Sequence, residues 1–265
     1  MIELNKIYNA DCIGDQGMRL ISDNSIDMIL CDLPYGTTEA IWDYIIDPVS
    51  LWSHYKRVIK ESGSIVLTAQ NPFSAKLICS NIDWYKHSFI WEKDKCANFL
   101  LGNHQPLKIH EDVLIFAKGG FTHNSKIKCT YNPQLSERKA RKGNFDEKER
   151  SVNMNTLKPR LNPTKIKSGK TFKEDKNLAK SVVYFATEHF NRIHPTQKPV
   201  ALFEYLIKTY SNEQETILDN CMGSGTTAIA CINTNRNYIG IEKDFFYYTS
   251  AINRIQQHTS QIKLF

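Results

Sequence analysis

A strand, a glycine-rich turn and a helix follow one another near the carboxyl end of the chain, and this order limits the fold more than any other feature. Thr216–Asp219 is a short apolar run with strand character, and Thr226–Asn233 has the apolar spacing of a helix. The turn between them contains Gly223-Ser224-Gly225, and a second predicted strand follows at residues 237–241. A strand–helix–strand unit of this length predicts a parallel sheet with a crossover helix.

The same alternation runs through most of the chain. Apolar side chains at intervals of three or four residues predict a helix around Leu51, Tyr55 and Val58, and Gly63 is predicted to end it. The sequence therefore predicts an α/β fold with a doubly wound, mostly parallel sheet. Further strands are predicted at residues 25–31, 64–69, 84–91 and 112–116, and further helices at residues 197–210 and 244–257.

Residues 119–188 lack this alternation. They are polar and basic, and Pro133, Pro159 and Pro163 interrupt them. We therefore predict two halves of one α/β domain, a catalytic half at residues 1–118 and a cofactor-binding half at residues 189–265, separated by an inserted target-recognition region. The insertion is either a compact irregular lobe or a set of long loops.

The basic charge of the chain is concentrated in this insertion. The net charge is +6, but the segment from residue 126 to residue 180 holds 16 Lys and Arg against 6 Asp and Glu. That segment alone carries +10, and the rest of the chain carries −4. It either binds the phosphates of a nucleic acid or is a solvated surface insertion. If it binds DNA, the candidate contacts are Lys139, Lys142, Lys165 and Lys167.

Several classes of protein do not fit this composition. No stretch approaches the roughly 20 apolar residues of a transmembrane helix, and the first residues lack the layout of a signal peptide. The seven cysteines are scattered without a Cys-x-x-Cys pair, and the eight histidines show no metal-binding spacing. We therefore expect reduced thiols, a cytoplasmic location and no bound metal.

The glycine turn has the features of a nucleotide-binding loop. Glycines let the backbone approach a ligand closely, and the helix that follows presents unpaired N–H groups. Glu242 lies 17 residues after Gly225, at the end of the next predicted strand, where a carboxylate can accept hydrogen bonds from both ribose hydroxyls. No Lys follows the second glycine, so the loop is not of the P-loop type. The pattern fits both NAD and S-adenosylmethionine.

The tetrapeptide Asp32-Leu33-Pro34-Tyr35 follows a predicted strand, at the edge where α/β sheets bind ligands. An amino group on an aromatic base is a weak nucleophile, because its lone pair is delocalised into the ring. The Asp32 carboxylate and the Leu33 carbonyl can each accept one N–H of that group and localise the lone pair, and Tyr35 can stack on the base. Pro34 would stiffen the loop. The alternative interpretation is an ordinary turn at the end of a strand.

Together these segments resemble the DNA amino-methyltransferases of the beta class. In that class a catalytic motif of the pattern D/N/S-P-P-Y/F/W comes first, a target-recognition region second and the cofactor motifs last. Residues 32–35 are similar to the catalytic motif, and residues 218–227, LDNCMGSGTT, resemble the family's LDPFxGSGTT loop. The other similar segments, in chain order, are residues 7–12, 110–116, 194–199 (HPTQKP, the family's H-P-T-x-K-P) and 240–242.

The resemblance implies a site-specific enzyme that transfers a methyl group from S-adenosylmethionine to adenine N6 in double-stranded DNA, with the target base flipped out of the helix. Asp at position 32 is more typical of N6-adenine members than of N4-cytosine members, which share every motif and are the alternative. The resemblance places Asp32, Leu33, Pro34 and Tyr35 in catalysis. At the cofactor it places Asp11, Cys12, Asp32, Thr196, Gln197, Lys198, Asp219, Gly223, Ser224, Gly225, Thr226, Thr227 and Glu242.

The resemblance also implies partners. Family members often form dimers, so we expect a homodimer, whereas the sequence leaves open whether a partner restriction endonuclease exists. Two other classes share part of the pattern. A nicotinamide-dependent oxidoreductase has no use for residues 32–35, and a non-catalytic DNA-binding module would leave two cofactor motifs without a role.

The sequence departs from the family pattern at three positions. Leu33 replaces a proline of the catalytic motif, which implies a less rigid loop that keeps the carbonyl. Asn220 and Cys221 replace Pro-Phe beside the glycine loop, which implies different packing near the cofactor.

The aromatic run at residues 245–248 is interpreted as core packing rather than as a cofactor contact.

Overall fold

The computed structural model describes residues 2–37, 43–137, 176–188 and 192–262. The chain divides into two units, one formed by Met1–Pro133 with Lys180–Phe265 and the other by Gln134–Ala179. In the smaller unit, the described residues form a two-stranded antiparallel ladder of β6 (Ser136–Glu137) and β7 (Lys176–Asn177).

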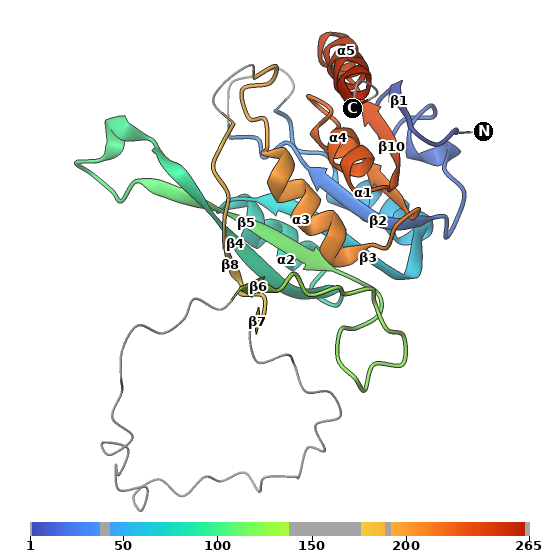
Figure 1. Ribbon diagram of the computed structural model, residues 1–265, viewed down its shortest axis with the longest axis horizontal. Coiled ribbons are helices and arrows are strands. Elements are labelled where there is room, and N and C mark those ends of the chain that lie inside the picture. Colours follow the sequence, from blue (N-terminus) through green and yellow to red (C-terminus); the bar gives the residue numbers. More distant parts are fainter. Residues whose placement is uncertain (1, 38–42, 138–175, 189–191, 263–265) are drawn as a thin grey trace, which may run out of the picture. The chain divides into compact units, whose positions relative to one another are not determined.

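An eight-stranded sheet forms the centre of the larger unit, in the order β1-β10-β9-β2-β3-β5-β4-β8 (Figure 1). Every neighbouring pair is parallel except the two made by β5, which runs antiparallel to β3 and to β4. The predicted doubly wound, mostly parallel sheet is therefore confirmed. Its strands are β1 (Lys6–Asn9), β2 (Ile26–Asp32), β3 (Ile59–Ala69), β4 (Tyr85–Ala97), β5 (Lys108–Phe116), β8 (Val182–Tyr184), β9 (Thr216–Asp219) and β10 (Asn237–Glu242).

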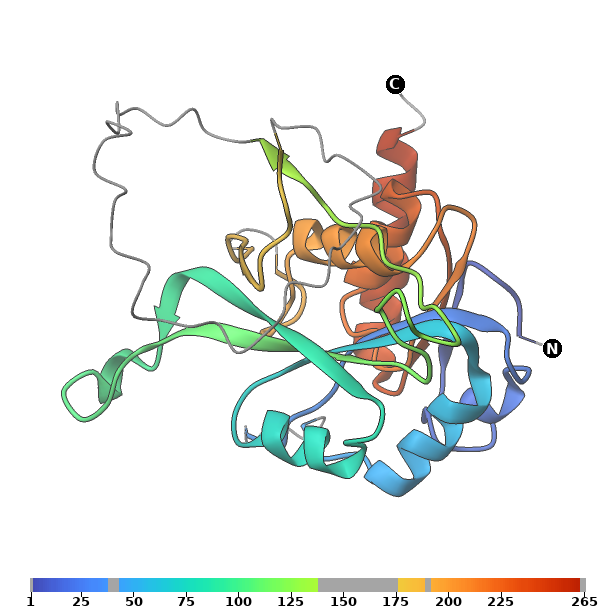
Figure 2. The same ribbon diagram turned by 90° about the horizontal axis from the view of Figure 1, so that it is seen from below.

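Helices cover both faces of this sheet (Figure 2). Side chains alternate along β2, so that Ile29 and Cys31 pack on the side of α1 and α2 while Met28 and Leu30 pack on the side of α3, α4 and α5. Because both faces are buried, residues 28–31 of β2 form a continuous apolar run instead of an alternating one. The helices are α1 (Pro48–Val58), α2 (Phe73–Ser80), α3 (Val200–Tyr210), α4 (Thr226–Asn233) and α5 (Phe245–Ile262).

Strands from the two halves of the chain pair at the centre of the sheet. Met28 of β2 pairs with Ile217 of β9, while the other edge of β2 pairs with β3. The strand order reverses at this pair, and in such sheets ligands bind at the carboxyl ends of the strands that flank the reversal. Asp32 and Asp219 are the last residues of β2 and β9, so both lie at this edge.

The start of α1 follows from its sequence, but its end does not. The Asp47 side chain accepts a hydrogen bond from the Ser50 N–H at 2.9 Å and caps the helix. The helix ends at Val58 and β3 begins at the next residue, so the prediction that Gly63 ends it is wrong. Gly63 lies inside β3, where the register with β2 is irregular and a side chain would come within 2.8 Å of the Asp27 carbonyl oxygen.

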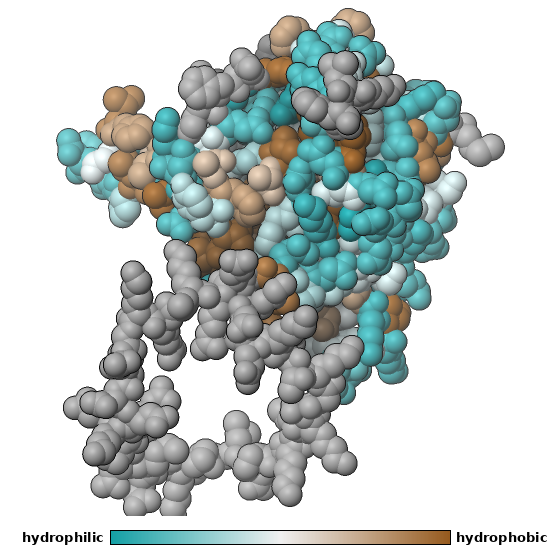
Figure 3. All heavy atoms as spheres, viewed as in Figure 1, coloured by the Kyte–Doolittle hydropathy of each residue, from teal (hydrophilic) through white to brown (hydrophobic). Residues whose placement is uncertain are grey.

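Two further features of the fold were not predicted: an additional helix and the extension of two predicted strands. Helix α2 follows β3, and β4 and β5 extend beyond their predicted bounds into a long hairpin (Figure 1). A short 3-10 turn at Phe99–Leu101 lies between these strands, and its exposed apolar side chains gather at the tip of the hairpin (Figure 3). Among the described residues, every helix is too short or too polar to span a membrane.

Candidate active site

A cavity of about 1020 Å³ opens at the carboxyl ends of β2, β9 and β10. It is of the size that binding sites for small molecules and cofactors have. Among the residues predicted to bind the cofactor, Asp11 and Gly225 are not part of its wall, and the predicted DNA contacts Lys139, Lys142, Lys165 and Lys167 lie outside the described residues. The predicted residues that line it are Cys12, Asp32, Leu33, Pro34, Tyr35, Thr196, Gln197, Lys198, Asp219, Gly223, Ser224, Thr226, Thr227 and Glu242.

One side of the cavity is formed by the glycine loop and Glu242. Gly223 has a φ of +53°, and its N–H donates a hydrogen bond of 2.7 Å to Glu242 Oε2. The other carboxylate oxygen, Oε1, accepts from the Asp244 N–H at 2.8 Å. Burial raises the pKa of Glu242, against the opposing effect of these hydrogen bonds. Each oxygen keeps one further acceptor position, so the pair can receive two adjacent hydroxyl groups.

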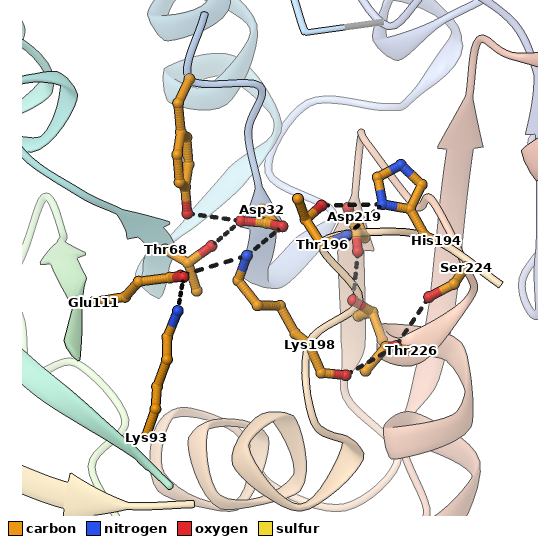
Figure 4. Close-up of polar contacts among 12 residues, drawn as sticks. Asp32, Thr68, Lys93, Glu111, His194, Thr196, Lys198, Asp219, Ser224 and Thr226 are labelled. Carbon is orange, nitrogen blue, oxygen red and sulfur yellow. Dashed lines mark hydrogen bonds and ion pairs between the residues drawn. The ribbon is translucent and has the colours of Figure 1, made fainter. Parts of the chain in front are cut away.

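The opposite side is centred on Asp32 (Figure 4). Its Oδ1 accepts a hydrogen bond from the Tyr35 hydroxyl at 2.8 Å and another from the Thr68 hydroxyl. Its Oδ2 lies 2.6 Å from Lys198 Nζ. Lys198 in turn lies 3.4 Å from Glu111 Oε2, and Lys93 pairs with Glu111 Oε1. The four charged side chains form an unbroken chain of alternating sign.

Lys198 is a buried cation. Burial alone would lower its pKa, but the carboxylates of Asp32 and Glu111 outweigh that effect and raise the pKa above its ordinary value. For Glu111, burial opposes ionisation, yet Lys198 and Lys93 lower the pKa. Both groups are therefore charged at neutral pH.

Tyr35 packs against Phe73 in this site. The ring centroids are 5.3 Å apart with an interplanar angle of 27°, and Lys198 Nζ lies 5.6 Å from the Tyr35 centroid. The Tyr35 hydroxyl is tied to Asp32, and burial raises its pKa well above the ordinary value, so it acts as a neutral hydrogen-bond donor. These contacts fix the ring beside the carboxylate that the sequence predicts to act on a base.

Comparison with known proteins identifies the family to which the chain belongs. Residues 26–253 match the N6/N4 methyltransferase model, described as DNA methylase. The chain belongs to this DNA methylase family. The predicted resemblance and the predicted class of enzyme are thereby confirmed.

Individual relatives span nearly the whole methylase. It is 28% identical to the Type II methyltransferase M.HinfI of Haemophilus influenzae, over 96% of this chain and 69% of the relative. It is 26% identical to the DNA adenine methyltransferase YhdJ of Escherichia coli, over 96% of this chain and 83% of the relative.

Solved structures share the fold of the methylase. The M1.HpyAVI–SAM complex superposes with a TM-score of 0.61 at 23% identity, covering 94% of this chain and 98% of the other. The cytosine-N4-specific PvuII DNA methyltransferase superposes with a TM-score of 0.64 at 12% identity, covering 98% and 92%.

Asp219 of the methylase is a buried carboxyl group behind the glycine loop. Its Oδ1 accepts from the Cys221 N–H at 3.0 Å, and its Oδ2 accepts from the Thr227 hydroxyl. Burial raises its pKa to about 7, although both hydrogen bonds act in the opposite direction. The side chain therefore holds the start of α4 to the end of β9.

The raised pKa of Asp219 predicts a pH-dependent effect of Asp219→Asn. The folded protein retains this proton up to about pH 7, whereas the unfolded chain releases it near the ordinary pKa of 3.8. The group therefore favours folding at low pH and loses that contribution as the pH rises between these values. We expect the difference in melting temperature between Asp219→Asn and the parent to favour the variant more at pH 8 than at pH 5. An equal difference at both pH values in calorimetric scans would contradict this assignment.

The two glycines of the loop have different surroundings. A Cβ atom on Gly223 would meet only the Cys221 carbonyl oxygen, at 3.9 Å, and would stand in the cavity wall. A Cβ atom on Gly225, whose φ is +81°, would lie 3.2 Å from the Cβ of Ala251 in α5. Close approach to a ligand is thus a property of Gly223, whereas Gly225 allows α5 to pack against the loop.

Asp11 lies behind the rim of the cavity. Its Oδ2 is 2.8 Å from Lys243 Nζ, and Lys243 also donates a hydrogen bond of 3.1 Å to the Tyr44 hydroxyl. Lys243 and Tyr44 line the cavity, so Asp11 orients two wall residues that no sequence motif identified. Neighbouring Cys12 lines the cavity itself.

The interpretation of residues 245–248 as core packing is wrong for the first three, since Tyr247 lines the cavity and belongs to neither core cluster. Phe245 is 70% exposed and Phe246 is 67% exposed, and Phe245 lines the cavity. Tyr248 packs against the core, as expected. Helix α5 begins with these aromatic residues, shortly after the strand that ends at Glu242, and that position beside the predicted cofactor loop was the available signal.

Proposed function

We propose that this methylase transfers the methyl group of S-adenosylmethionine to the N6 atom of adenine in double-stranded DNA. The observation that carries the proposal is that the Gly223–Glu242 pair and Asp32 open onto one cavity. A nucleoside held by the first and an amino group held by the second would therefore lie within the same space. Proximity and orientation of this kind supply most of the acceleration of a displacement reaction.

The residues around the glycine loop fit S-adenosylmethionine. Glu242 can accept hydrogen bonds from the two ribose hydroxyls, and Gly223 leaves room for the nucleoside because it has no side chain. When bound, S-adenosylmethionine supplies an electrophilic methyl group on a sulfonium centre. Phe245 and Tyr247, in the wall beside Glu242, offer apolar surface to an aromatic base.

Asp32 would act on the target amino group. Its carboxylate accepts one N–H and the Leu33 carbonyl accepts the other, which localises the nitrogen lone pair toward the methyl group. Leu33 is buried and lines the cavity, so replacement of the family's proline leaves its backbone at the site. Because the amino group of a stacked base is out of reach, the target base must leave the helix.

Adenine is favoured over cytosine by two observations. The first is the Asp at position 32, which is more typical of N6-adenine enzymes of this family. The second is the similarity to a relative named as a DNA adenine methyltransferase over 96% of the chain. The likeness to the cytosine-N4-specific structure is at 12% identity and concerns the fold alone.

Nucleoside analysis tests this proposal. The methylase is incubated with unmethylated genomic DNA and S-adenosylmethionine labelled in its methyl group, and the DNA is digested to nucleosides for mass spectrometry. We expect labelled N6-methyladenine. If the only labelled product were N4-methylcytosine, the target base would be cytosine and not adenine. If DNA from several sources remained without label after incubation, the proposed reaction would be wrong.

We also propose that residues 126–180 hold the DNA backbone, because this segment carries +10 in a chain that is otherwise −4. Replacing Lys139, Lys142, Lys165 and Lys167 together by Gln should weaken binding to every DNA sequence, since phosphate contacts carry no sequence information. The slope of log DNA affinity against log salt concentration should become less steep by roughly 0.9 for each lysine–phosphate interaction that is removed. S-adenosylmethionine affinity should stay unchanged.

A salt titration of DNA affinity checks this prediction. The matched control replaces four lysines of the larger unit that already pair with carboxylates, namely Lys6, Lys60, Lys118 and Lys208. Identical salt slopes for the parent and the segment variant would mean that the segment is a solvated insertion.

The biological setting that we propose is a restriction–modification system in the cytoplasm. Several relatives are named as Type II methyltransferases, the class of enzyme that accompanies a restriction endonuclease. We therefore propose a partner endonuclease of the same DNA specificity and a homodimeric methylase. Sedimentation of the purified protein tests the dimer.

A further inference from the structure

The charged chain that ends at Asp32 is larger than the proposed reaction requires. Asp32 is at the end of β2, Lys198 precedes α3, Glu111 is in β5 and Lys93 is in β4. All four side chains line the cavity, and Figure 4 shows that they point toward one another. The reaction as proposed uses only Asp32, which leaves the cation and the second carboxylate beside it to be explained.

The distribution of hydrogen bonds distinguishes the two oxygens of Asp32. Each carboxylate oxygen can accept two hydrogen bonds. Oδ1 accepts from Tyr35 and Thr68, so both its positions are occupied. Oδ2 accepts from Lys198, which leaves one position for the N–H of a target amino group. Lys198 thereby fixes which oxygen faces the base, and its own ammonium group is adjacent to that oxygen.

An ammonium group in this place has an electrostatic cost for the reaction. The target nitrogen gains positive charge as the methyl group is transferred, and charges interact strongly where water is excluded. With Asp32 alone, Lys198 would form a neutral pair that offers little stabilisation to that charge. Glu111, which is 9% exposed and lies 3.4 Å from Lys198, shares the charge of that ammonium group with Asp32, while Lys93 balances the charge of Glu111 at its other oxygen.

The geometry of Glu111 suits this role. Its Oε1 is held by Lys93, whereas its Oε2 faces Lys198 and, among the described residues, has no hydrogen bond of good geometry. A buried carboxylate oxygen with an incomplete set of partners is costly for stability alone. This orientation couples Glu111 to the ammonium group that also holds Oδ2 of Asp32.

We propose that Glu111 is a positioning residue for methyl transfer that acts through Lys198: Glu111 holds the Lys198 ammonium group in place, and that group fixes Oδ2 of Asp32 toward the target amino group. The proposal rests on the proposed function of Asp32. It assigns no contact with S-adenosylmethionine to Glu111, so cofactor affinity and methyl transfer should respond differently to its replacement.

The first test replaces Glu111 by Gln, which keeps the size of the side chain and removes its charge. Single-turnover methyl transfer to DNA should slow by about 10- to 100-fold, while S-adenosylmethionine affinity stays within about threefold. Glu111→Asp, which keeps the charge, should lose less activity than Glu111→Gln. The matched control is Glu61→Gln, the same change in an exposed ion pair with Lys118, and it should behave as the parent.

A double-mutant cycle then separates action through Lys198 from a general structural role. Lys198→Met alone should be strongly impaired, because it releases Oδ2 of Asp32 and leaves Glu111 Oε2 buried without a cation, with Lys93 paired only to the other oxygen. In that background, adding Glu111→Gln should slow transfer by less than about threefold or restore part of it. An equal loss in both backgrounds would overturn the proposal, as would a Glu111→Gln rate equal to that of Glu61→Gln.

The outcomes also distinguish this inference from the proposed function. An active parent with an unaffected Glu111→Gln variant refutes only the positioning role. A parent that transfers no labelled methyl group to DNA refutes the proposed function itself. A Glu111→Gln variant that loses S-adenosylmethionine affinity in parallel with its rate would place Glu111 at the cofactor and overturn the inference, provided that its melting temperature matches that of Glu111→Asp.

Discussion

Asp32→Asn is expected to slow methyl transfer at least about 10³-fold, which is the scale on which loss of a positioned acceptor acts. The amide keeps the shape of the side chain, so Tyr35 and Thr68 can still donate to its oxygen. Its NH₂ group, however, would replace Oδ2 and would face the Lys198 ammonium and the target amino group as a third donor. Single-turnover transfer of labelled methyl groups measures the effect.

The control for this variant is Asp23→Asn, in an exposed ion pair with Arg57. It should transfer methyl groups at the parent rate. S-adenosylmethionine affinity of Asp32→Asn, measured by calorimetry, should stay within about fivefold of the parent, a difference of about 1 kcal/mol. A transfer rate within about tenfold of the parent, or about 1.4 kcal/mol in the barrier, would exclude Asp32 as the acceptor.

Gly225→Val is expected to destabilise the fold and to abolish S-adenosylmethionine binding as a consequence. A non-glycine residue at a φ of +81° is strained, and its Cβ would press on Ala251 and Ile255 of α5. Together these effects should cost about 3 kcal/mol or more, which corresponds to a decrease of about 10 °C in melting temperature for a chain of this size. Differential scanning fluorimetry with and without S-adenosylmethionine measures both quantities.

Gly223→Ala is the matched variant, because its Cβ would meet only one backbone oxygen, at 3.9 Å. We expect its melting temperature to fall by only a few degrees, since the strain of a left-handed alanine is about 1 kcal/mol. Its S-adenosylmethionine affinity should nevertheless fall by about tenfold or more, because the methyl group enters the cavity wall. If Gly225→Val kept the parent melting temperature, the assignment of Gly225 to helix packing would be wrong.

The sequence was sufficient to locate the two halves of the site because each half is local. Asp32 and Glu242 end strands with strong apolar patterns, and the glycine loop lies between a strand and a helix whose bounds were predicted correctly. In a parallel sheet the carboxyl ends of strands share one edge, so local patterns were enough to place these residues together. Periodicity also predicted the buried face of α1, formed by Leu51, Tyr55 and Val58.

The partners of Asp32 could not be predicted in this way. Thr68, Glu111 and Lys198 come from separate elements, and only the order of strands brings them to one carboxylate. Lys198 was assigned to the cofactor on the resemblance, and its pairing with Asp32 depends on the chain path before α3. The prediction that Gly63 ends α1 failed for a related reason. A glycine that ends a helix and a glycine that permits an irregularity in a strand look the same in the local sequence.

The pairing of β2 with β9 also determines when the enzyme can first act during its own synthesis. Residues 26–32 leave the ribosome long before residues 216–219, which form the partner strand of β2. Strand β1 likewise can pair with β10 only after synthesis has reached Glu242. Until then, one edge of β2 has no partner and the cavity lacks one of its walls. A nascent chain that carries Asp32 but ends before Glu242 therefore lacks the residues of β9 and β10 that complete the cavity.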